Sequence, residues 1–450
     1  MDAIESAESA VSVQTLQAPL RGSFDLRRFS SDAVLVIGAA LVANVFSYAF
    51  HFILSRRLGP DHYGTLATMI AISGMLGVLG SAVGTVAMQE TARMWASHLD
   101  RRIAPFVRRT GLSVLALAGL VAAAIALLSL PLQTYLHVAD PLLWLLLAVY
   151  VGAAIFSGFA RGAAQGAHRF GIFATSLVSE GVAKVVFAVA FVSLGFGVGG
   201  ALGGLICGVV IGVGIVFAPM VFGGAHDASH LGERVRLQGE AAKVLTVTAT
   251  TSALLFVDML FAKHHFSGVV TGYFSAAGTV ARTIPYGVGL VALVLMPKAA
   301  AAQHASRDSL RRILIMAGAI ALALTALSLA FIMALPREII AVTYGAKYLA
   351  AVPILRVYAL DEALFSIFAV AVSYLVAIAR YQVFAYLLAA AVVESLCMAL
   401  FGGTPLHLLR IAITVNALLV PVVWALAWRS LAAAPQAATP VRAEGAASIP

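Results

Sequence analysis

The sequence predicts an all-α protein embedded in a membrane, and its composition, its apolar runs and their length lead to this prediction. Of the 450 residues, 61% are hydrophobic and only 11% are charged, whereas soluble domains are about 45–50% apolar and about 25% charged. The apolar residues form unbroken runs of about 20, which is the helix length that crosses a hydrocarbon core. A membrane β-barrel would instead alternate apolar and polar residues over segments of roughly 10.

Each membrane span is predicted from one apolar run, and together the runs give about twelve transmembrane helices. The expected spans are 33–54, 64–89, 110–130, 142–160, 172–194, 197–222, 243–263, 272–297, 312–335, 352–378, 383–402 and 408–428. Residues before the first span lack a signal-peptide core, so we expect the first span to stay as a membrane anchor.

The distribution of Lys and Arg predicts the orientation of the spans. With the N-terminus in the cytoplasm, 20 of the 29 Lys and Arg residues fall on the cytoplasmic side and seven on the outer side. This bias predicts that both termini are cytoplasmic. It also explains the net charge of +9 as a topology signal, so we expect no nucleic-acid partner. The basic stretch 101–109 predicts contact with anionic membrane lipids.

The longest polar connection follows the sixth span and divides the chain into two halves. The predicted organisation is a cytoplasmic N-terminal tail (1–31), an N-lobe (32–222), a cytoplasmic linker (223–242), a C-lobe (243–430) and a disordered C-terminal tail (431–450). The last of these is predicted from its Ala and Pro content.

A weak internal repeat supports two related halves. The chain reads LSRRLGPDHYGTLA from Leu54 and FAKHHFSGVVTGYFSA from Phe261. In each case a helix is expected to end in a basic residue, a short loop follows, and Gly beside Tyr opens the next helix. Parallel repeats of this kind are typical of transporters whose substrate path lies between the halves.

No motif of an enzyme occurs in the chain. Metal-ligand spacings, nucleophile motifs and Walker-type loops are missing, so we predict no catalytic residue, no metal and no cofactor. The glycine-rich stretch 197–204 continues at every fourth position to Gly212, which predicts close helix packing rather than nucleotide binding. Cys207 and Cys397 lie in apolar runs and are expected to be small buried residues without a disulfide.

Four stretches carry a resemblance to a known family. They read LSRRLGPDHYGTLATMIAISGMLGVLG (54–80), ARGAAQGAHRFGIFATSLVSEGVAK (160–184), LLFVDMLFAKHHFSGVVTGYFSAAGTVAR (254–282) and YGAKYLAAVPILRVYAL (344–360). In this order they resemble bacterial polysaccharide-transport flippases of the Wzx type, within the multidrug/oligosaccharidyl-lipid/polysaccharide exporter (MOP) superfamily. The resemblance covers roughly residues 30–430.

The resemblance implies a MATE-like fold, with two six-helix bundles around a central cavity. It also implies a function, which is to move an oligosaccharide on polyprenyl diphosphate across the bacterial inner membrane by alternating access. The product would serve cell-surface polysaccharide, such as lipopolysaccharide, or exopolysaccharide. Polymerases or glycosyltransferases of the same synthesis are the implied protein partners. Because the chain has no ATP motif, the energy is expected from an ion gradient, the membrane potential or the substrate gradient.

Arg282 is the first candidate for binding the substrate diphosphate. A charge at membrane depth costs about 2.5–3.5 kcal/mol, so it needs a partner or a function. Its guanidinium could hold a diphosphate bidentately. The alternative is an internal ion pair with Asp258, which is itself a candidate for coupling transport to a proton or a sodium ion.

Three further substrate-binding candidates are Glu180, Lys184 and Arg56. Glu180 and Lys184 are four residues apart, so they either form a pair on one helix face or line the cavity. Arg56 either anchors the first span at the headgroups or meets the diphosphate near the exit. Asp361 and Glu394 are the remaining ion-coupling candidates, with structural hydrogen bonding as the alternative.

Two other functions remain open at this point. The first is a cation-coupled multidrug or small-solute antiporter of the same superfamily, which would have an acidic cavity. The second is a non-transporting membrane scaffold of a polysaccharide synthesis complex, which would tolerate the loss of charges within its spans.

Overall fold

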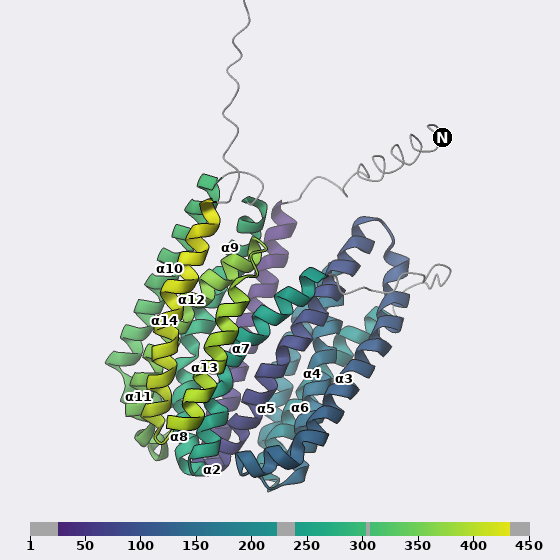
Figure 1. The fold of residues 1–450 in the computed structure, drawn as a ribbon. Helices are drawn as coiled ribbons and strands as arrows, with labels where there is room; N and C mark the ends of the chain where they lie inside the picture. Colours follow the sequence, from purple (N-terminus) through teal and green to yellow (C-terminus); the bar gives the residue numbers. More distant parts are fainter. Residues whose placement is uncertain (1–25, 223–238, 303–306, 433–450) are drawn as a thin grey trace, which may run out of the picture. The chain divides into compact units, whose positions relative to one another are not determined.

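The structure is a computed structural model that describes residues 26–222, 239–302 and 307–432. These residues are almost entirely helical, and no strand occurs among them (Figure 1). The helices before the predicted linker are α2 (Leu26–Ala96), α3 (Asp100–Leu136), α4 (Pro141–Gly166), α5 (Phe170–Ser193) and α6 (Gly197–Phe222). Those after it are α7 (Gly239–His265), α8 (Gly268–Ala281), α9 (Thr283–Ala302), α10 (Arg307–Ala334), α11 (Pro336–Thr343), the short 3₁₀ helix η1 (Ala346–Ala351), α12 (Val352–Ala377), α13 (Val383–Phe401) and α14 (Pro405–Ala432).

Ten of the described helices are long and apolar enough to cross a membrane. The apolar part of α2 alone covers 63 residues, and one crossing needs about 20, so α2 contains both the first and the second predicted span. The all-α, membrane-spanning fold class is therefore confirmed. Most of the predicted N-terminal tail, linker and C-terminal tail lies outside the described residues.

The predicted loop between the first two spans is instead a break of one residue inside α2. Gly59 has a φ of 74° and a ψ of 171°, and the backbone is helical on both sides of it. A positive φ favours glycine, and Pro60 both excludes helical geometry for the residue before it and suits the first turn of the next helix. Sequence reasoning placed a loop here because the stretch is polar, but helical hydrogen bonding continues up to the break.

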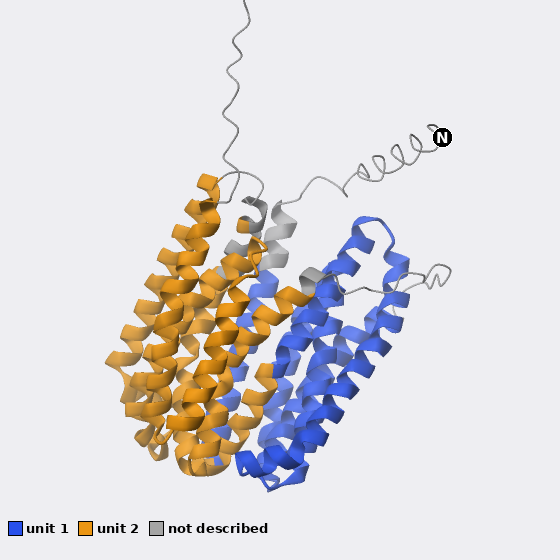
Figure 2. Cartoon of the chain, in the orientation of Figure 1, with its two compact units in different colours: residues 1–58, 76–241 blue, residues 59–75, 242–450 orange. Residues whose placement is uncertain are grey.

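The described chain divides into two compact units (Figure 2). Unit 1 comprises residues 1–58 and 76–241, and unit 2 comprises residues 59–75 and 242–450. The predicted N-lobe included the segment 59–75, whereas the structure groups this segment with unit 2.

Close backbone packing explains why the segment 59–75 belongs to unit 2. A Cβ atom on Gly64 would stand 2.8 Å from both the carbonyl oxygen of Gly268 and the backbone nitrogen of Gly272. The hydroxyl of Tyr63 lies 3.1 Å from that of Tyr344, and both rings are buried. The two Gly-Tyr motifs of the internal repeat, one in α2 and one in α8, therefore pack against each other at Gly64 and Gly272 within unit 2.

The glycine stripe of α6 packs against α5 in unit 1, as the sequence predicts. A Cβ on Gly208 would stand 2.8 Å from the Cβ of Lys184, and one on Gly212 would stand 3.2 Å from the Cβ of Glu180. Glycine at these positions lets the two helix backbones approach closely. This packing fixes the position of α5, which carries two of the predicted site residues.

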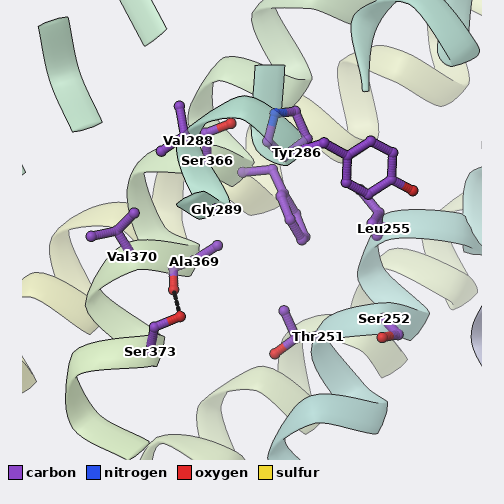
Figure 3. A pocket seen from close by; sticks show the side chains of 12 residues that line it. Thr251, Ser252, Leu255, Tyr286, Val288, Gly289, Ser366, Ala369, Val370 and Ser373 are labelled. Atoms are coloured by element: carbon purple, nitrogen blue, oxygen red, sulfur yellow. Dashed lines mark hydrogen bonds between the residues drawn. The ribbon is translucent and has the colours of Figure 1, made fainter. Parts of the chain in front are cut away.

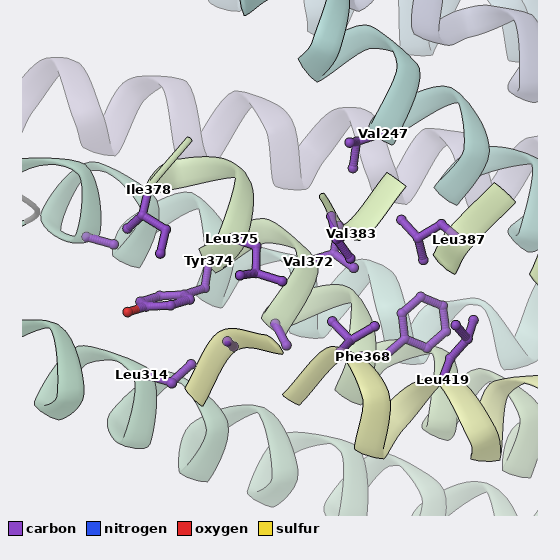
Figure 4. Close-up of a cluster of buried hydrophobic side chains, with 14 of the residues drawn as sticks. Val247, Leu314, Phe368, Val372, Tyr374, Leu375, Ile378, Val383, Leu387 and Leu419 are labelled. Atoms are coloured by element: carbon purple, nitrogen blue, oxygen red, sulfur yellow. The ribbon is translucent and has the colours of Figure 1, made fainter. Parts of the chain in front are cut away.

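The apolar core of unit 2 joins α12 to α7, α10, α13 and α14, and it also includes Ala299 of α9. Figure 4 shows Phe368 and Leu375 of α12 packed among side chains from the other four helices, including Leu314, Leu387 and Leu419. All five of these side chains are at most 5% exposed. This core holds α12 rigidly in the unit, and α12 carries the carboxylates described below.

Candidate functional site

Arg282 lies at the break between α8 and α9 in unit 2. The predicted span 272–297 is interrupted here because Pro285 has no N–H to bond the carbonyl of Ala281, four residues earlier. The Arg282 Nη2 atom lies 2.9 Å from Asp258 Oδ1, and its Nε atom lies 3.3 Å from Glu362 Oε1. The ion pair with Asp258, which the sequence offered as the alternative role of Arg282, is thus present. The Glu362 carboxylate contacts the same guanidinium.

Further contacts enclose the Arg282 guanidinium. It donates to the carbonyl oxygen of Leu255 from Nε at 3.2 Å and from Nη2 at 2.8 Å. Nη2 also donates to the Tyr358 hydroxyl at 2.7 Å, and that hydroxyl donates to Asp258. The rings of Phe256 and Tyr358 lie 5.0 and 5.4 Å from the guanidinium carbon. We call Arg282, Asp258, Tyr358 and Glu362 the Arg282 cluster; all four are buried.

A second polar group lies next to this cluster, on α12, α13 and α14. Asn416 donates from Nδ2 to Asp361 Oδ1 at 2.8 Å. Glu394 is 1% exposed and lies within electrostatic range of Asp361. Within the described residues, Glu362 Oε2, both carboxylate oxygens of Glu394 and Asn416 Oδ1 have no hydrogen-bond partner. Buried acceptors without donors are unfavourable, so this group is suited to hold protons or a cation.

Unit 1 contains a separate polar cluster on α2, α4 and α5. Arg161 Nη2 lies 2.5 Å from Glu180 Oε2, and the two side chains are 17% and 20% exposed. Lys184 donates to Ser47 Oγ at 2.6 Å. Arg161 Nε donates to Ser176 Oγ at 3.1 Å, and that hydroxyl donates to the Gly212 carbonyl oxygen at 2.8 Å. We call Arg161, Glu180, Lys184, Ser47 and Ser176 the unit 1 cluster.

Of the two alternatives for Glu180 and Lys184, the pair between them is not formed, because Glu180 bonds Arg161 and Lys184 bonds Ser47. Sequence reasoning missed Arg161 by placing it in a cytoplasmic loop, whereas α4 continues through Gly166. A signal for this continuation was present: Gly158, Gly162 and Gly166 recur at every fourth position, and each packs on the backbone of α2. Such a stripe predicts a helix, and Arg161 lies within it.

The two arginines at the end of the first predicted span are exposed. Arg57 donates to Ser193 Oγ, at the end of α5, at 2.5 Å. Arg56 lies outside the unit 1 cluster as defined above, so its contact with substrate stays a prediction. Cys207 and Cys397 are both free, as expected, but they are half-buried rather than buried.

Unit 2 also contains a pocket of about 180 Å³ between α7, α9 and α12. It is lined by residues within 251–255, 285–286, 288–289 and 365–373. Figure 3 shows them arranged around an open space between the three helices. Leu255, whose carbonyl oxygen accepts both bonds from Arg282, forms part of the wall. The pocket and the Arg282 cluster therefore share a stretch of α7.

Comparisons with known proteins agree on a family and a fold. Residues 31–303 match a family model described as polysaccharide biosynthesis protein. A multidrug resistance MATE family transporter of the MOP superfamily, solved in an inward-facing conformation, aligns with a TM-score of 0.71 at 14% identity, covering 89% of this chain and 98% of that chain. An outward-facing structure of such a transporter aligns with a TM-score of 0.63 at 15% identity, covering 89% and 94%. Comparison with curated protein sequences gives no significant match. The structural likeness shows that the fold is MATE-like.

Proposed function

The chain belongs to the polysaccharide biosynthesis protein family, and from this premise we propose that it transports a polyprenyl-diphosphate-linked oligosaccharide across the bacterial inner membrane. Transport proceeds by alternating access of two lobes and supplies lipopolysaccharide or exopolysaccharide synthesis. Both termini are cytoplasmic in this proposal, and the polymerase or glycosyltransferases of the same synthesis act beside it. No covalent bond is made or broken, so the protein is not an enzyme.

The unit 1 cluster is the observation that carries the substrate proposal. It contains two cations, Arg161 and Lys184, and one anion, Glu180, so its net charge is positive. The ion-paired side chains are partly exposed, which leaves them accessible to a ligand. Arg offers a planar fork of donors and Lys a compact positive charge, and both are suited to phosphate oxygens. We therefore assign the diphosphate contact to Lys184 and Arg161, with Glu180 orienting the Arg161 fork.

Arg282 receives a different assignment in this proposal. The Arg282 guanidinium is already bonded to Asp258, Glu362 and a backbone carbonyl, and the whole residue is only 7% exposed. A diphosphate would have to displace two carboxylates from it. The binding role predicted from the sequence for Arg282 is thus less favoured than a positioning role, in which it holds α7, α9 and α12 together.

Energy coupling is assigned to the carboxylates of unit 2. Asp258, Asp361, Glu362 and Glu394 are buried beside one cation, Arg282. Four ionised carboxylates there would leave a strongly negative interior, which is unfavourable at low dielectric. Protons or a monovalent cation bound to this group relieve that charge. Asp258, Asp361 and Glu394 are accordingly the proposed coupling residues.

The same acidic group favours a second candidate function, a cation-coupled multidrug antiporter. An antiporter would bind a cationic ligand at unit 2, and it would not depend on the cations of unit 1. A membrane scaffold, in contrast, would depend on neither group. Substitutions in the unit 1 cluster and among the unit 2 carboxylates therefore distinguish the flippase, the antiporter and the scaffold experimentally.

The experiment starts from a strain that lacks the protein. The lipid-linked oligosaccharide is extracted and its sidedness measured, with complementation by the wild type, Lys184→Ala, Lys184→Arg and Lys347→Ala. We expect cytoplasmic accumulation that the wild type and Lys347→Ala relieve and that Lys184→Ala does not. Lys347 is the matched control because it is an exposed cation on η1, outside the unit 1 cluster. If the deletion causes no accumulation, the flippase function is wrong.

A further inference from the structure

The pocket between α7, α9 and α12 has the size of one six-membered ring. A buried cavity of about 150 Å³ holds benzene, and this pocket measures about 180 Å³. It lies wholly within unit 2, so its shape depends on helices that the unit's own core holds in place. A whole oligosaccharide is far too large for it, whereas one ring with its substituents fits.

The polar lining of the pocket offers hydrogen-bond acceptors. The hydroxyls of Thr251, Ser366 and Ser373 donate to carbonyl oxygens of their own helices, at 2.9, 2.6 and 2.9 Å. Their hydrogens are thus used within the protein. The Thr251 and Ser373 oxygens, on half-buried side chains, keep lone pairs available to a ligand, whereas Ser366 is 1% exposed. Figure 3 shows one of these bonds, from Ser373 to Ala369. A ligand that matches this lining carries several hydroxyl donors.

The remaining lining is apolar and partly aromatic. Leu255, Val288 and Val370 contribute aliphatic surface, and Phe365 and Tyr286 contribute rings. Pockets for organic ligands are mostly apolar with a few polar groups that fix the orientation. A hydrocarbon chain would leave the hydroxyl acceptors without donors, and a bare ion would face an apolar wall. A pyranose ring, with hydroxyls at its edge and C–H groups on its faces, matches both the hydroxyl acceptors and the apolar lining of the pocket.

The start of α9 provides the entrance. Tyr286 lines the pocket, yet it is 51% exposed, so the pocket reaches the surface beside it. Gly287 and Gly289 have open space where a Cβ would be. In the proposed topology, the pocket residues of α7, α9 and α12 all lie on the cytoplasmic side of the Arg282 cluster. A ligand arriving from the cytoplasm meets the pocket before it meets the carboxylates.

We propose that this pocket binds one sugar ring of the transported glycan, through the Thr251 and Ser373 hydroxyls and the faces of Tyr286 and Phe365. This inference rests on the proposed function, and it adds a glycan-recognition site in unit 2 to the diphosphate contact in unit 1. The Arg282 bonds to the Leu255 carbonyl connect this site to the coupling residues. The identity of the ring is set by which of its hydroxyls face the Thr251 and Ser373 acceptors.

A pair of glycine variants tests the proposal directly. Gly289→Leu adds a bulky side chain at the pocket wall, because Gly289 lines the pocket and has open space where a Cβ would be. Gly287→Leu is the matched control, since it also meets open space on α9 but is not a lining residue. Thr251→Val removes one hydrogen-bond acceptor and preserves the side-chain shape. This variant tests the same site if Gly289→Leu fails to fold.

Binding is measured by saturation-transfer NMR on the purified full-length protein, with glucose, galactose, rhamnose and N-acetylglucosamine as probes and farnesol as the apolar competitor. We expect at least one sugar to bind the wild type and Gly287→Leu equally. Gly289→Leu should weaken that binding about tenfold, and Thr251→Val about threefold. Binding that Gly289→Leu leaves unchanged, no binding by any of the four sugars, or displacement of a bound sugar by farnesol would each overturn the proposal.

The sidedness assay separates this inference from the function on which it rests. If the deletion strain accumulates no lipid-linked oligosaccharide, the proposed function itself has failed. If the wild type relieves accumulation and Gly289→Leu relieves it equally well, the function stands and the sugar-ring site is wrong. Loss of rescue by Gly289→Leu alone, with Gly287→Leu active at equal expression, supports both.

Discussion

Arg161 and Glu180 join α4 to α5 through an ion pair of 2.5 Å, and Lys184, one turn along α5 from Glu180, bonds the Ser47 hydroxyl instead. A mutual Glu180–Lys184 pair would have been electrically neutral. The observed arrangement neutralises Arg161 and leaves the Lys184 charge bonded to a neutral group. The net charge of the cluster is +1 with either pairing, and the observed choice of partners leaves the excess positive charge on Lys184, next to a neutral hydroxyl, where it suits a diphosphate.

The Arg161–Glu180 pair should contribute modestly to stability. Its two side chains are partly exposed, which places it between a surface pair and a buried one. We expect Arg161→Ala and Glu180→Ala each to lower the free energy of unfolding by about 1–2 kcal/mol, with a coupling energy of about 1 kcal/mol in the double mutant. Thermal unfolding of the four proteins in one lipid mixture measures the cycle. Additive effects of the two substitutions would mean that the pair contributes nothing.

Arg282→Gln should fail mainly through instability. The substitution leaves Asp258 and Glu362 buried without their cation, and breaking a buried pair in this way costs about 3–5 kcal/mol. Arg282→Lys should recover part of the stability, because Lys restores the charge but cannot form the same set of bonds. Apparent Tm and transport are measured side by side. A variant that unfolds at the wild-type temperature yet transports nothing would instead favour the direct contact with diphosphate predicted from the sequence.

Glu394→Gln should separate coupling from stability. Neither carboxylate oxygen of Glu394 has a hydrogen-bond partner in the described structure, so a neutral side chain fits its surroundings. We expect the variant to keep the wild-type apparent Tm, because glutamine reproduces the shape of a protonated acid. In proteoliposomes with an imposed pH gradient, its transport should no longer respond to collapse of that gradient. Asp140→Asn is the control, since Asp140 is an exposed helix cap. An unchanged response in Glu394→Gln would remove this residue from the coupling group.

The sequence predicted the spans well because each depends on a local property, the length of an apolar run. The breaks at Gly59 and Arg282 escaped this reasoning for opposite reasons. Around Gly59 the chain is polar enough to suggest a loop, although the backbone is helical on both sides of this one residue. Around Arg282 the apolar run continues, and only Pro285 signals that a backbone bond is missing.

The candidate site was harder to predict because its partners come from separate helices. A pair of Arg282 and Asp258 was the alternative to diphosphate binding. Glu362 was assigned no contact with them, and Tyr358 gave no signal as one aromatic residue in an apolar span. Asn416 is a polar residue at membrane depth, which could have marked it as a partner for a buried acid. Spacing along one helix identifies which residues share a face, but helix packing determines which residues they bond.

The contact between Gly64 and Gly272 gives the last prediction. Gly64→Ala would bring a methyl group to 2.8 Å from backbone atoms of α8, which cannot move aside as a side chain can. We expect a loss of about 1–3 kcal/mol in stability, as for overpacked cores. Gly77→Ala, on the same helix, meets nothing within 4 Å, so it should be neutral or stabilising by up to about 1 kcal/mol through helix propensity. Apparent Tm values of both variants test the contact. Equal values would show that the segment 59–75 is not held against α8 by this backbone contact.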